Sequence, residues 1–163
     1  MWKVKKSKVH GYGVFATQNI KKNKKIIEYI GEKITKKEGD KRSSIRIKKY
    51  LRSKVTGSVY IFELNKKYDI DGSPTYNKAR YINHSCNPNC EVDIINDQIW
   101  ISSIKNVKKG DELSYDYGYE FDKDDFKDHE CRCGAKNCIG FIISSDDWGK
   151  YLKHLKKIVS NRK

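Results

Sequence analysis

The five cysteines of this chain fall in two short segments, and their spacing limits what the chain can fold into. Arg80–Cys90 has the sequence Arg-Tyr-Ile-Asn-His-Ser-Cys-Asn-Pro-Asn-Cys, and Cys131–Cys138 has the sequence Cys-Arg-Cys-Gly-Ala-Lys-Asn-Cys. Three cysteines lie within eight residues, with a fourth about 45 positions upstream. This set suits one tetrahedral zinc–thiolate site better than a disulfide framework. Asn83 and His84, between an apolar stretch and a proline turn, indicate a binding site beside it.

Length and composition predict a single intracellular domain. At 163 residues the chain can bury a sizeable core, and it has no low-complexity tract. Met1–Lys8 is basic, but no apolar run of signal-peptide length follows, and no stretch approaches the ~20 apolar residues of a membrane helix. An odd number of cysteines fits a reducing compartment. We therefore expect a monomer of the cytoplasm, nucleoid or nucleus that is neither secreted nor bound to a membrane.

The positive charge is concentrated in the first third of the chain. Residues 1–57 hold 18 Lys and Arg against 4 Asp and Glu, a net of +14, whereas residues 58–163 hold 17 of each. A basic face of this size attracts nucleic acid or a nucleoprotein particle. A merely solvated surface in a Lys-rich chain is an equally good interpretation, because no interleaved aromatic pattern and no recognition motif accompany the charge.

The segment from Asp116 to Glu130 has the opposite sign, with seven acidic residues against Lys123 and Lys127. An acidic rim beside an active site would suit a basic peptide substrate. A solvated acidic loop is the alternative.

The hydrophobic pattern predicts a β-rich α+β domain built from short strands. β-branched and aromatic residues, several in alternation, favour strands over 14–17, 25–35, 58–64, 68–71, 91–95, 98–103 and 112–117. Asn96-Asp97 predicts a hairpin turn, and Lys109-Gly110-Asp111 a second turn. Ile45, Tyr50 and Leu51 favour a short, strongly basic helix between Glu38 and Val55.

A clearer helix is predicted at the C-terminal end. Its apolar residues recur at 3.6-residue spacing: Trp148, Tyr151, Leu152, Leu155, Ile158 and Val159. Ser144, three residues before Asp147, is typical of a capping box. We expect the apolar stripe to dock on the domain, and a partner-binding face is the alternative.

Taken together, the motifs resemble those of SET-domain protein-lysine methyltransferases with a post-SET zinc module. Five blocks match in the family's order over roughly residues 3–142: His10–Phe15, Glu28–Glu32, Arg80–Asn89, Glu112–Tyr117 and the Cys131–Cys138 cluster. His-Gly-x-Gly, Tyr-Asp-Tyr and Cys-x-Cys-Gly-Ala-Lys lean toward the trithorax-like branch. The resemblance implies a SET fold of short β-sheets with a knot-like active site, divided into a SET domain (1–118), a post-SET segment (119–142) and a C-terminal helix (143–163).

The resemblance also implies roles for individual residues. Tyr117 would be the catalytic tyrosine, Tyr29 would line the lysine channel, and Tyr115 would set how many methyl groups are added. S-adenosylmethionine would be bound by His10, Gly11, Tyr12, Tyr60, Asn83, His84 and Arg132, with Phe141 also in the segment that closes over it. The implied reaction is methylation of a lysine in a basic protein, histone-like or ribosomal, stopping mainly at monomethyl-lysine.

By the same resemblance, Cys86 would join Cys131, Cys133 and Cys138 as ligands of one structural zinc ion. Spacing alone would also allow His84 as a ligand, and Cys90 is then left as a small core residue. A full set of four thiolates leaves no open position for catalytic water.

Some features depart from the family pattern. Tyr76 replaces a small residue, and the insert between Gly31 and Tyr60 is short and highly basic, so peptide specificity does not transfer. A basic zinc-stabilised binding module and a catalytically inert scaffold remain as alternatives to an enzyme.

Overall fold

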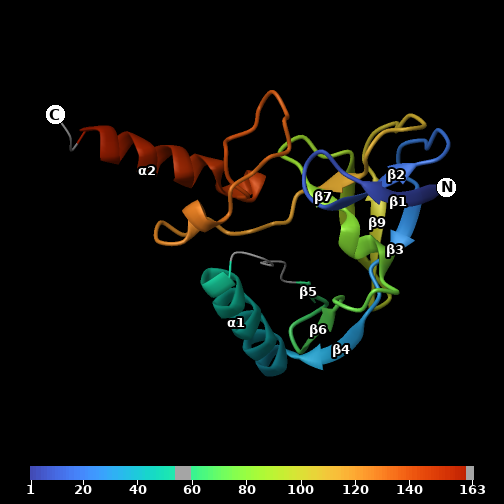
Figure 1. Cartoon of the computed structure of the whole chain (residues 1–163), viewed down its shortest axis with the longest axis horizontal. Helices are drawn as coiled ribbons and strands as arrows, with labels where there is room; N and C mark the ends of the chain where they lie inside the picture. Colours follow the sequence, from blue (N-terminus) through green and yellow to red (C-terminus); the bar gives the residue numbers. More distant parts are fainter. Residues whose placement is uncertain (54–59, 161–163) are drawn as a thin grey trace.

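A computed structural model describes residues 1–53 and 60–160, and it shows small β-sheets gathered at one side with two α-helices projecting from them (Figure 1). The strands are β1 (Trp2–Lys6), β2 (Tyr12–Ala16), β3 (Lys25–Glu28), β4 (Glu32–Thr35), β5 (Ile61–Glu63), β6 (Tyr68–Asp71), β7 (Asn83–His84), β8 (Cys90–Ile95), β9 (Gln98–Ser103) and β10 (Ser114–Tyr115). The helices are α1 (Lys36–Ser53) and α2 (Trp148–Ser160), with short 3₁₀ turns η1 (Lys78–Tyr81), η2 (Phe126–Asp128) and η3 (Ser145–Asp147).

The sheets are short and mostly antiparallel, which confirms the predicted β-rich α+β class. β1 pairs with β2, β9 lies between β3 and β8, and β6 lies between β4 and β5. β10 is the exception, because it runs parallel to β7. That pairing joins the two segments that the resemblance places at the active site.

The predicted turn at Asn96-Asp97 connects β8 and β9. Both residues have positive φ, 51° and 58°, which is the backbone that a two-residue hairpin of the I′ type requires. The predicted strand 25–35 is instead two strands, separated at Gly31. A Cβ at Gly31 would collide with the backbone of Asp71, so the glycine allows the chain to pass close to β6.

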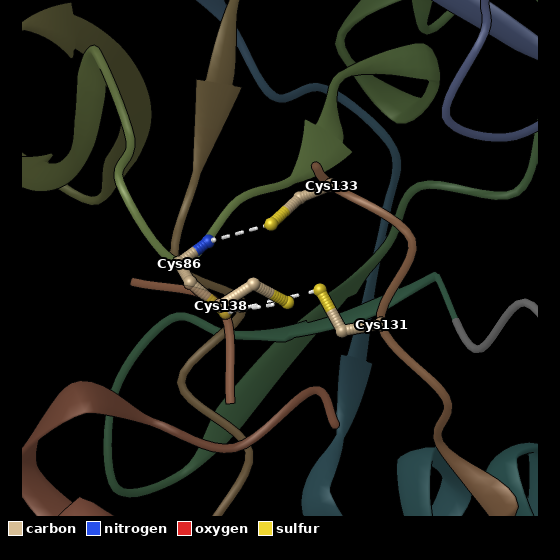
Figure 2. Close-up of side chains that lie close together, drawn as sticks. All are labelled: Cys86, Cys131, Cys133 and Cys138. Carbon is tan, nitrogen blue, oxygen red and sulfur yellow. Dashed lines mark hydrogen bonds between the residues drawn. The ribbon is translucent and has the colours of Figure 1, made fainter. Parts of the chain in front are cut away.

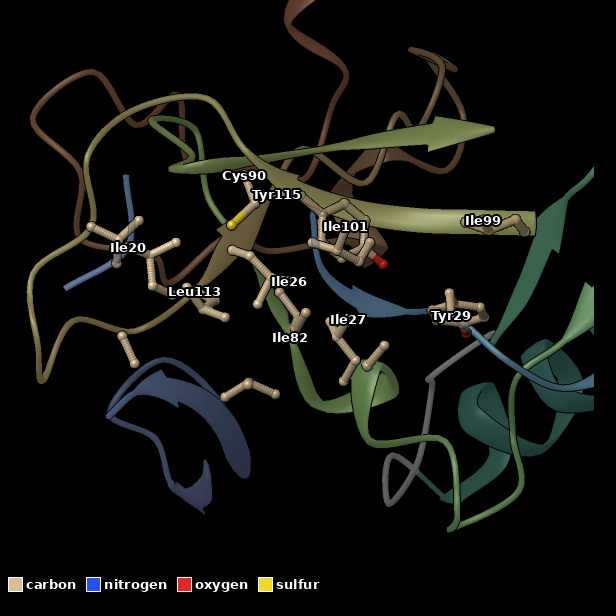
Figure 3. Packing of buried hydrophobic residues seen from close by; sticks show 14 of the residues in the cluster. Ile20, Ile26, Ile27, Tyr29, Ile82, Cys90, Ile99, Ile101, Leu113 and Tyr115 are labelled. Atoms are coloured by element: carbon tan, nitrogen blue, oxygen red, sulfur yellow. The ribbon is translucent and has the colours of Figure 1, made fainter. Parts of the chain in front are cut away.

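The main hydrophobic core lies where these sheets meet (Figure 3). Val14, Ile101 and Leu113 are fully buried, and Ile82 and Ile99 are 1% exposed. Burial of each such side chain contributes about 1.5–3 kcal/mol, so this cluster is the principal source of stability. Cys90 is also buried in this core, as predicted.

Ion pairs join the described side chains of α1 to the sheet. Arg42 and Arg46 both hydrogen-bond the buried carboxylate of Asp71, and Lys36 bonds Asp69 at 2.7 Å. Ile45 is 57% exposed, so the expectation that it would line the inner face of the helix is wrong. The helix itself lies where it was predicted. The side chains of Tyr50 and Leu51, and residues Val55, Ser58 and Val59 of the predicted elements, lie outside what the structure describes.

The C-terminal helix α2 docks through its first half and then extends away from the β-rich body (Figure 1). Trp148, Tyr151 and Leu155 pack in a second cluster with Phe126 and Ile143. By contrast, Leu152 and Val159 of the same predicted apolar stripe are 50% and 62% exposed, so the stripe is only partly covered.

The start of α2 differs from the predicted capping box. The Ser144 hydroxyl accepts from the N–H of Asp146, which caps the preceding turn η3 instead of the helix. The Asp147 carboxylate accepts from the distant N–H of Phe121, because the chain folds back to lie beside it. None of the helices in the described part of the chain has the length and apolar character needed to cross a membrane.

Candidate active site and cysteine cluster

A row of aromatic rings runs through the site that the sequence predicts to be catalytic. The ring of Tyr29 lies 5.2 Å from that of Phe62, which lies 6.2 Å from Tyr115. Tyr115 lies 5.1 Å from Tyr117, and Tyr117 lies 5.9 Å from Tyr119. The structure thus brings the predicted tyrosines 29, 115 and 117 together, although they come from separate parts of the chain.

Backbone contacts fix the position of these tyrosines. The pairing of β10 with β7 places Tyr115 opposite His84, and the N–H of Tyr117 donates to Nδ1 of His84 at 3.2 Å. The hydroxyl of Tyr117 donates to the carbonyl of Ile82 at 3.0 Å. The hydroxyl of Tyr29 donates to the carbonyl of Tyr60 at 3.0 Å. Each hydroxyl is therefore held in one orientation.

The tyrosine hydroxyls are neutral at physiological pH. Burial raises the pKa of Tyr29, Tyr115, Tyr117 and Tyr119 above the ordinary value, and neighbouring tyrosines raise the first three further. A tyrosine with a raised pKa does not act as a base near pH 7. These side chains can instead donate or accept a fixed hydrogen bond and provide aromatic faces.

The predicted cofactor loop is tied to Asn83. The Asn83 amide donates to the carbonyl of Tyr12 at 3.1 Å, to that of His10 at 3.4 Å and to the Glu112 carboxylate at 2.7 Å. Gly13 must lack a side chain, because a Cβ there would overlap the Glu112 carboxylate. Gly11 adopts φ 47°, a left-handed conformation that glycine tolerates best.

The remaining predicted cofactor residues flank this loop. The Arg80 guanidinium lies 4.1 Å from the ring centre of Tyr60, and Tyr12, which is 54% exposed, packs edge-on against Tyr81. His84 is buried, and burial lowers its pKa, so its imidazole is mainly neutral.

Arg132 and Phe141 lie in the post-SET segment. Arg132 is exposed and pairs with Glu130 at 2.7 Å. The ring of Phe141 packs against Phe126 and Tyr151 in the second hydrophobic cluster. Phe141 therefore has a packing role in this structure.

Four cysteines converge from β7's end and the post-SET segment (Figure 2). The sulfur atoms of Cys86, Cys131, Cys133 and Cys138 all lie within 4.8 Å of one another, and Cys86 Sγ lies 3.8 Å from both Cys131 Sγ and Cys138 Sγ. Tetrahedral zinc–sulfur bonds of ~2.3 Å would place the sulfurs about 3.8 Å apart. The donor set therefore fits one zinc ion in number, type and spacing.

Backbone N–H groups point at these sulfurs. The N–H of Cys86 donates to Cys133 Sγ at 3.5 Å, and that of Gly140 donates to Cys138 Sγ at 3.4 Å. Burial tends to raise the pKa of Cys133, but the N–H groups of Cys86 and Ala135 outweigh it and lower that pKa to about 7. Burial raises the pKa of Cys86 to about 11. His84 Nε2 lies 3.6 Å from Cys86 Sγ and outside the four-sulfur set.

Sequence reasoning missed three residues of the site. Phe62 and Tyr119 complete the row of rings, and Glu112 joins Asn83 to the Ser7 hydroxyl. Tyr119 carried a signal, because it continues the Tyr115, Tyr117 alternation along the chain. The other two show their role only when distant segments meet.

A groove of about 570 Å³ opens on one side of Tyr117. Its walls come from β5, β8, the chain at Tyr117-Gly118 and the turn at Ser144–Asp146. None of the predicted cofactor residues lines it, so the groove is distinct from the cofactor loop.

Comparisons with known proteins agree with this geometry. The SET domain family model matches residues 11–118. An H3 lysine-4 specific histone-lysine N-methyltransferase of Aspergillus oryzae is 37% identical over 141 residues, covering 84% of this chain and 11% of the relative. Histone-lysine N-methyltransferase 2D of Homo sapiens is 36% identical, covering 82% of this chain and 2% of the relative. Histone-lysine N-methyltransferase set-2 of Caenorhabditis elegans is 36% identical, covering 87% and 9%.

This chain therefore spans only a small part of the length of the relatives it matches. The match nevertheless covers most of the chain, and it includes Tyr29, Tyr115 and Tyr117 and the cofactor loop from Gly11 onward. The chain belongs to the SET domain family, and its relatives place it in the trithorax-like branch.

Proposed function

We propose that this chain is the catalytic domain of a protein-lysine N-methyltransferase that uses S-adenosylmethionine. One observation carries the proposal, namely that Tyr117 contacts two different sites. It lines the groove, and it is also hydrogen-bonded to Ile82 and His84, the neighbours in sequence of the Asn83 that holds the cofactor loop. A transferase needs such a meeting point, because donor and acceptor must approach the same atoms from opposite directions.

The residues of the loop suit this cofactor in kind. S-adenosylmethionine supplies an electrophilic methyl group on a sulfonium and carries an ammonium, a carboxylate and an adenine. The carbonyls of His10 and Tyr12 and the carboxylate of Glu112 are acceptors for the ammonium, and Gly11 leaves room for close approach. We assign cofactor binding to His10, Gly11, Tyr12, Tyr60, Asn83, His84 and Arg132.

The tyrosine row prepares the acceptor lysine. Free lysine has a pKa of ~10.4, and an aromatic channel disfavours the charged ammonium. Because Tyr29, Tyr115 and Tyr117 have raised pKa values, they stay protonated and orient the neutral amine instead of removing its proton. Their rings also stabilise a methylated ammonium by cation–π contact.

We assign the four-cysteine set a structural zinc ion. With all four positions filled by thiolates, the ion would hold the post-SET segment against Cys86, three residues after Asn83. This supports the proposed division into a SET domain (1–118), a post-SET segment (119–142) and a C-terminal helix (143–163), in which the metal joins the first two units.

The proposed substrate is a lysine of a basic protein in the same compartment, of the histone or another nucleoprotein class. Support comes from the names of the relatives and from the four carboxylates that line the groove, with no basic side chain among its lining residues. Tyr115 is 7% exposed and retains a hydroxyl beside Tyr117, which favours monomethyl-lysine as the main product.

Docking on nucleic acid is a second proposal, which rests on α1. In this helix, Arg42 and Arg46 donate hydrogen bonds to the buried carboxylate of Asp71. The side chains of Lys37, Lys41 and Lys48 are exposed to solvent. A row of exposed lysines on one helix suits contacts with phosphates.

Calorimetry with S-adenosylmethionine, followed by transfer of its labelled methyl group to core histones and to a cell lysate, tests the main proposal. We expect one cofactor per chain and label on lysine. Cofactor binding without transfer to any protein would favour a scaffold, and the lack of both would favour a basic binding module.

A further inference from the structure

One wall of the groove comes from a part of the chain beyond the match to the SET domain family. The SET model ends at residue 118, whereas Ser144, Ser145 and Asp146 line the groove together with Tyr117 and Gly118. The lining of the groove also contains Phe62 of β5, whose ring lies in the tyrosine row. A peptide whose lysine enters at Tyr117 would therefore pass the Ser144–Asp146 turn.

Three hydrogen bonds fix this turn to the segment after β10 that bears Tyr117 and Tyr119. The N–H of Ser145 donates to Asp116 Oδ2 at 2.8 Å, and the N–H of Ser144 donates to the carbonyl of Tyr119 at 2.7 Å. In return, Asp147, which is 7% exposed, accepts from the N–H of Phe121 at 2.9 Å. These bonds hold the turn in place beside Tyr117, so it forms an ordered wall of the groove.

The charges on this groove are all of one sign. Glu63, Glu91, Asp116 and Asp146 line it, although the whole chain carries a net charge of +14. Glu63 pairs with Lys36 at 2.9 Å, and Asp116 accepts from Ser145 and Gly118. Glu91 and Asp146 are both exposed, and within residues 1–53 and 60–160 no ion pair neutralises either carboxylate. Of these two, Asp146 belongs to the turn that is hydrogen-bonded to the segment of Tyr117, and it is available to a cation that enters the groove.

We propose that Asp146 determines specificity, by pairing with a lysine or arginine that flanks the acceptor lysine in the substrate. This inference rests on the proposed function and adds to it the residue that selects the sequence around the acceptor. Asp147 acts through Asp146, as a positioning residue that keeps the turn against the segment that follows Tyr117. The ion pair between Asp146 and the substrate residue would lie at an exposed rim. The preference for a peptide with a flanking basic residue is therefore modest and weakens as salt rises.

Fluorescence anisotropy with labelled peptides measures this preference without requiring catalysis. Each peptide holds one lysine and either arginine or glutamine at one of the three positions on either side of it. We expect the wild type to bind one arginine peptide about three- to fivefold more tightly than its glutamine counterpart at low salt. Asp146→Asn, which keeps the shape of the side chain, should remove that difference.

Asp125→Asn is the matched control, because Asp125 is an exposed carboxylate of the acidic segment outside the groove, with no side-chain cap bond. It should keep the full preference. With methyl transfer measured in parallel, Asp146→Asn should raise KM for the arginine peptide and leave kcat unchanged.

Outcomes for binding and for transfer are separable. If Asp146→Asn keeps the preference of the wild type, or if the wild type shows none, the inference is overturned whatever the activity. If the preference depends on Asp146 but no peptide is methylated, the inference stands as peptide recognition and the proposed function fails.

Discussion

Replacing Tyr117 with phenylalanine separates the chemical role of its hydroxyl from its contribution to folding. The hydroxyl makes one hydrogen bond, to the carbonyl of Ile82, and Ile82 is 1% exposed. Loss of that bond costs about 1 kcal/mol of stability, which corresponds to a fall in Tm of about 2–4 °C for a chain of this size. The ring and its stacking with Tyr115 and Tyr119 are retained.

The effect on catalysis should be much larger. Removing one fixed polar group from a transition state typically lowers turnover at least ~100-fold, which is about 2.7 kcal/mol of activation energy. We expect Tyr117→Phe to bind S-adenosylmethionine nearly as the wild type does, with turnover reduced by that factor. Calorimetry, thermal melting and transfer of a labelled methyl group measure the three quantities on the same preparation.

Tyr151→Phe is the control, because Tyr151 is a buried tyrosine that packs in the second cluster, away from the tyrosine row. It should lower Tm by a similar or smaller amount and leave turnover unchanged. Undiminished turnover in Tyr117→Phe would refute the role assigned to this hydroxyl. An equal loss of turnover in both variants would show that the effect comes from altered packing and not from the missing hydroxyl of Tyr117.

The remaining predictions concern the metal, the product and acid stability. The protein should purify with one zinc per chain, and Cys133→Ser should lower zinc content by elemental analysis together with activity. Tyr115→Phe should shift the product from monomethyl- toward di- and trimethyl-lysine, as seen by mass spectrometry, because displacing a water held by the hydroxyl costs roughly 1–2 kcal/mol. Burial of Asp71 is outweighed by Arg46 and Arg42, which lower its pKa. Its stabilisation is therefore complete above pH ~4 and lost as pH falls below that, which acid unfolding followed by circular dichroism measures.

Each of these has a control and a contrary outcome. Cys90 lies outside the four-sulfur set, so the Cys90→Ser variant should keep its zinc. Full activity of metal-free protein would contradict a structural role for the ion. Abundant trimethyl-lysine from the unmutated enzyme would contradict the assignment of Tyr115. Asp71→Asn should flatten the acid dependence, and an unchanged curve would show that other carboxylates dominate it.

Local signals predicted the parts of the fold that depend on local chemistry. Gln98–Ser103 and Tyr68–Asp71 form strands with the predicted limits, and the Asn96-Asp97 turn has the expected positive φ. β1 was missed because its alternation of Trp2 and Val4 with lysines was attributed to a charged terminus. β7 was missed because two residues carry no periodic signal, and Asn83–His84 form a strand only by pairing with β10.

The candidate site divides in the same way. Spacing pointed to the cysteine cluster, and the resemblance to the SET family pointed to Cys86 and to Tyr29, Tyr115 and Tyr117; the structure places each set together. Phe62 and Glu112 depend on contacts between segments far apart in the chain, which no local pattern encodes. The exposure of Ile45 was unexpected because the arginine partners of Asp71 turn the face of α1 that bears Arg42 and Arg46 toward the sheet, and Ile45 lies off that face.

The two hydrophobic clusters also bear on the order in which the molecule matures during synthesis. The main core draws on residues from Trp2 to Tyr117, whereas the second cluster is built within the shorter stretch from Phe121 to Leu155. A chain made from its N-terminus can therefore pack its main core before the second stretch emerges, and that stretch can then fold through nearby contacts. The wall at Ser144–Asp146 is added last, so a nascent chain holds its tyrosines before it has a complete groove to receive a substrate.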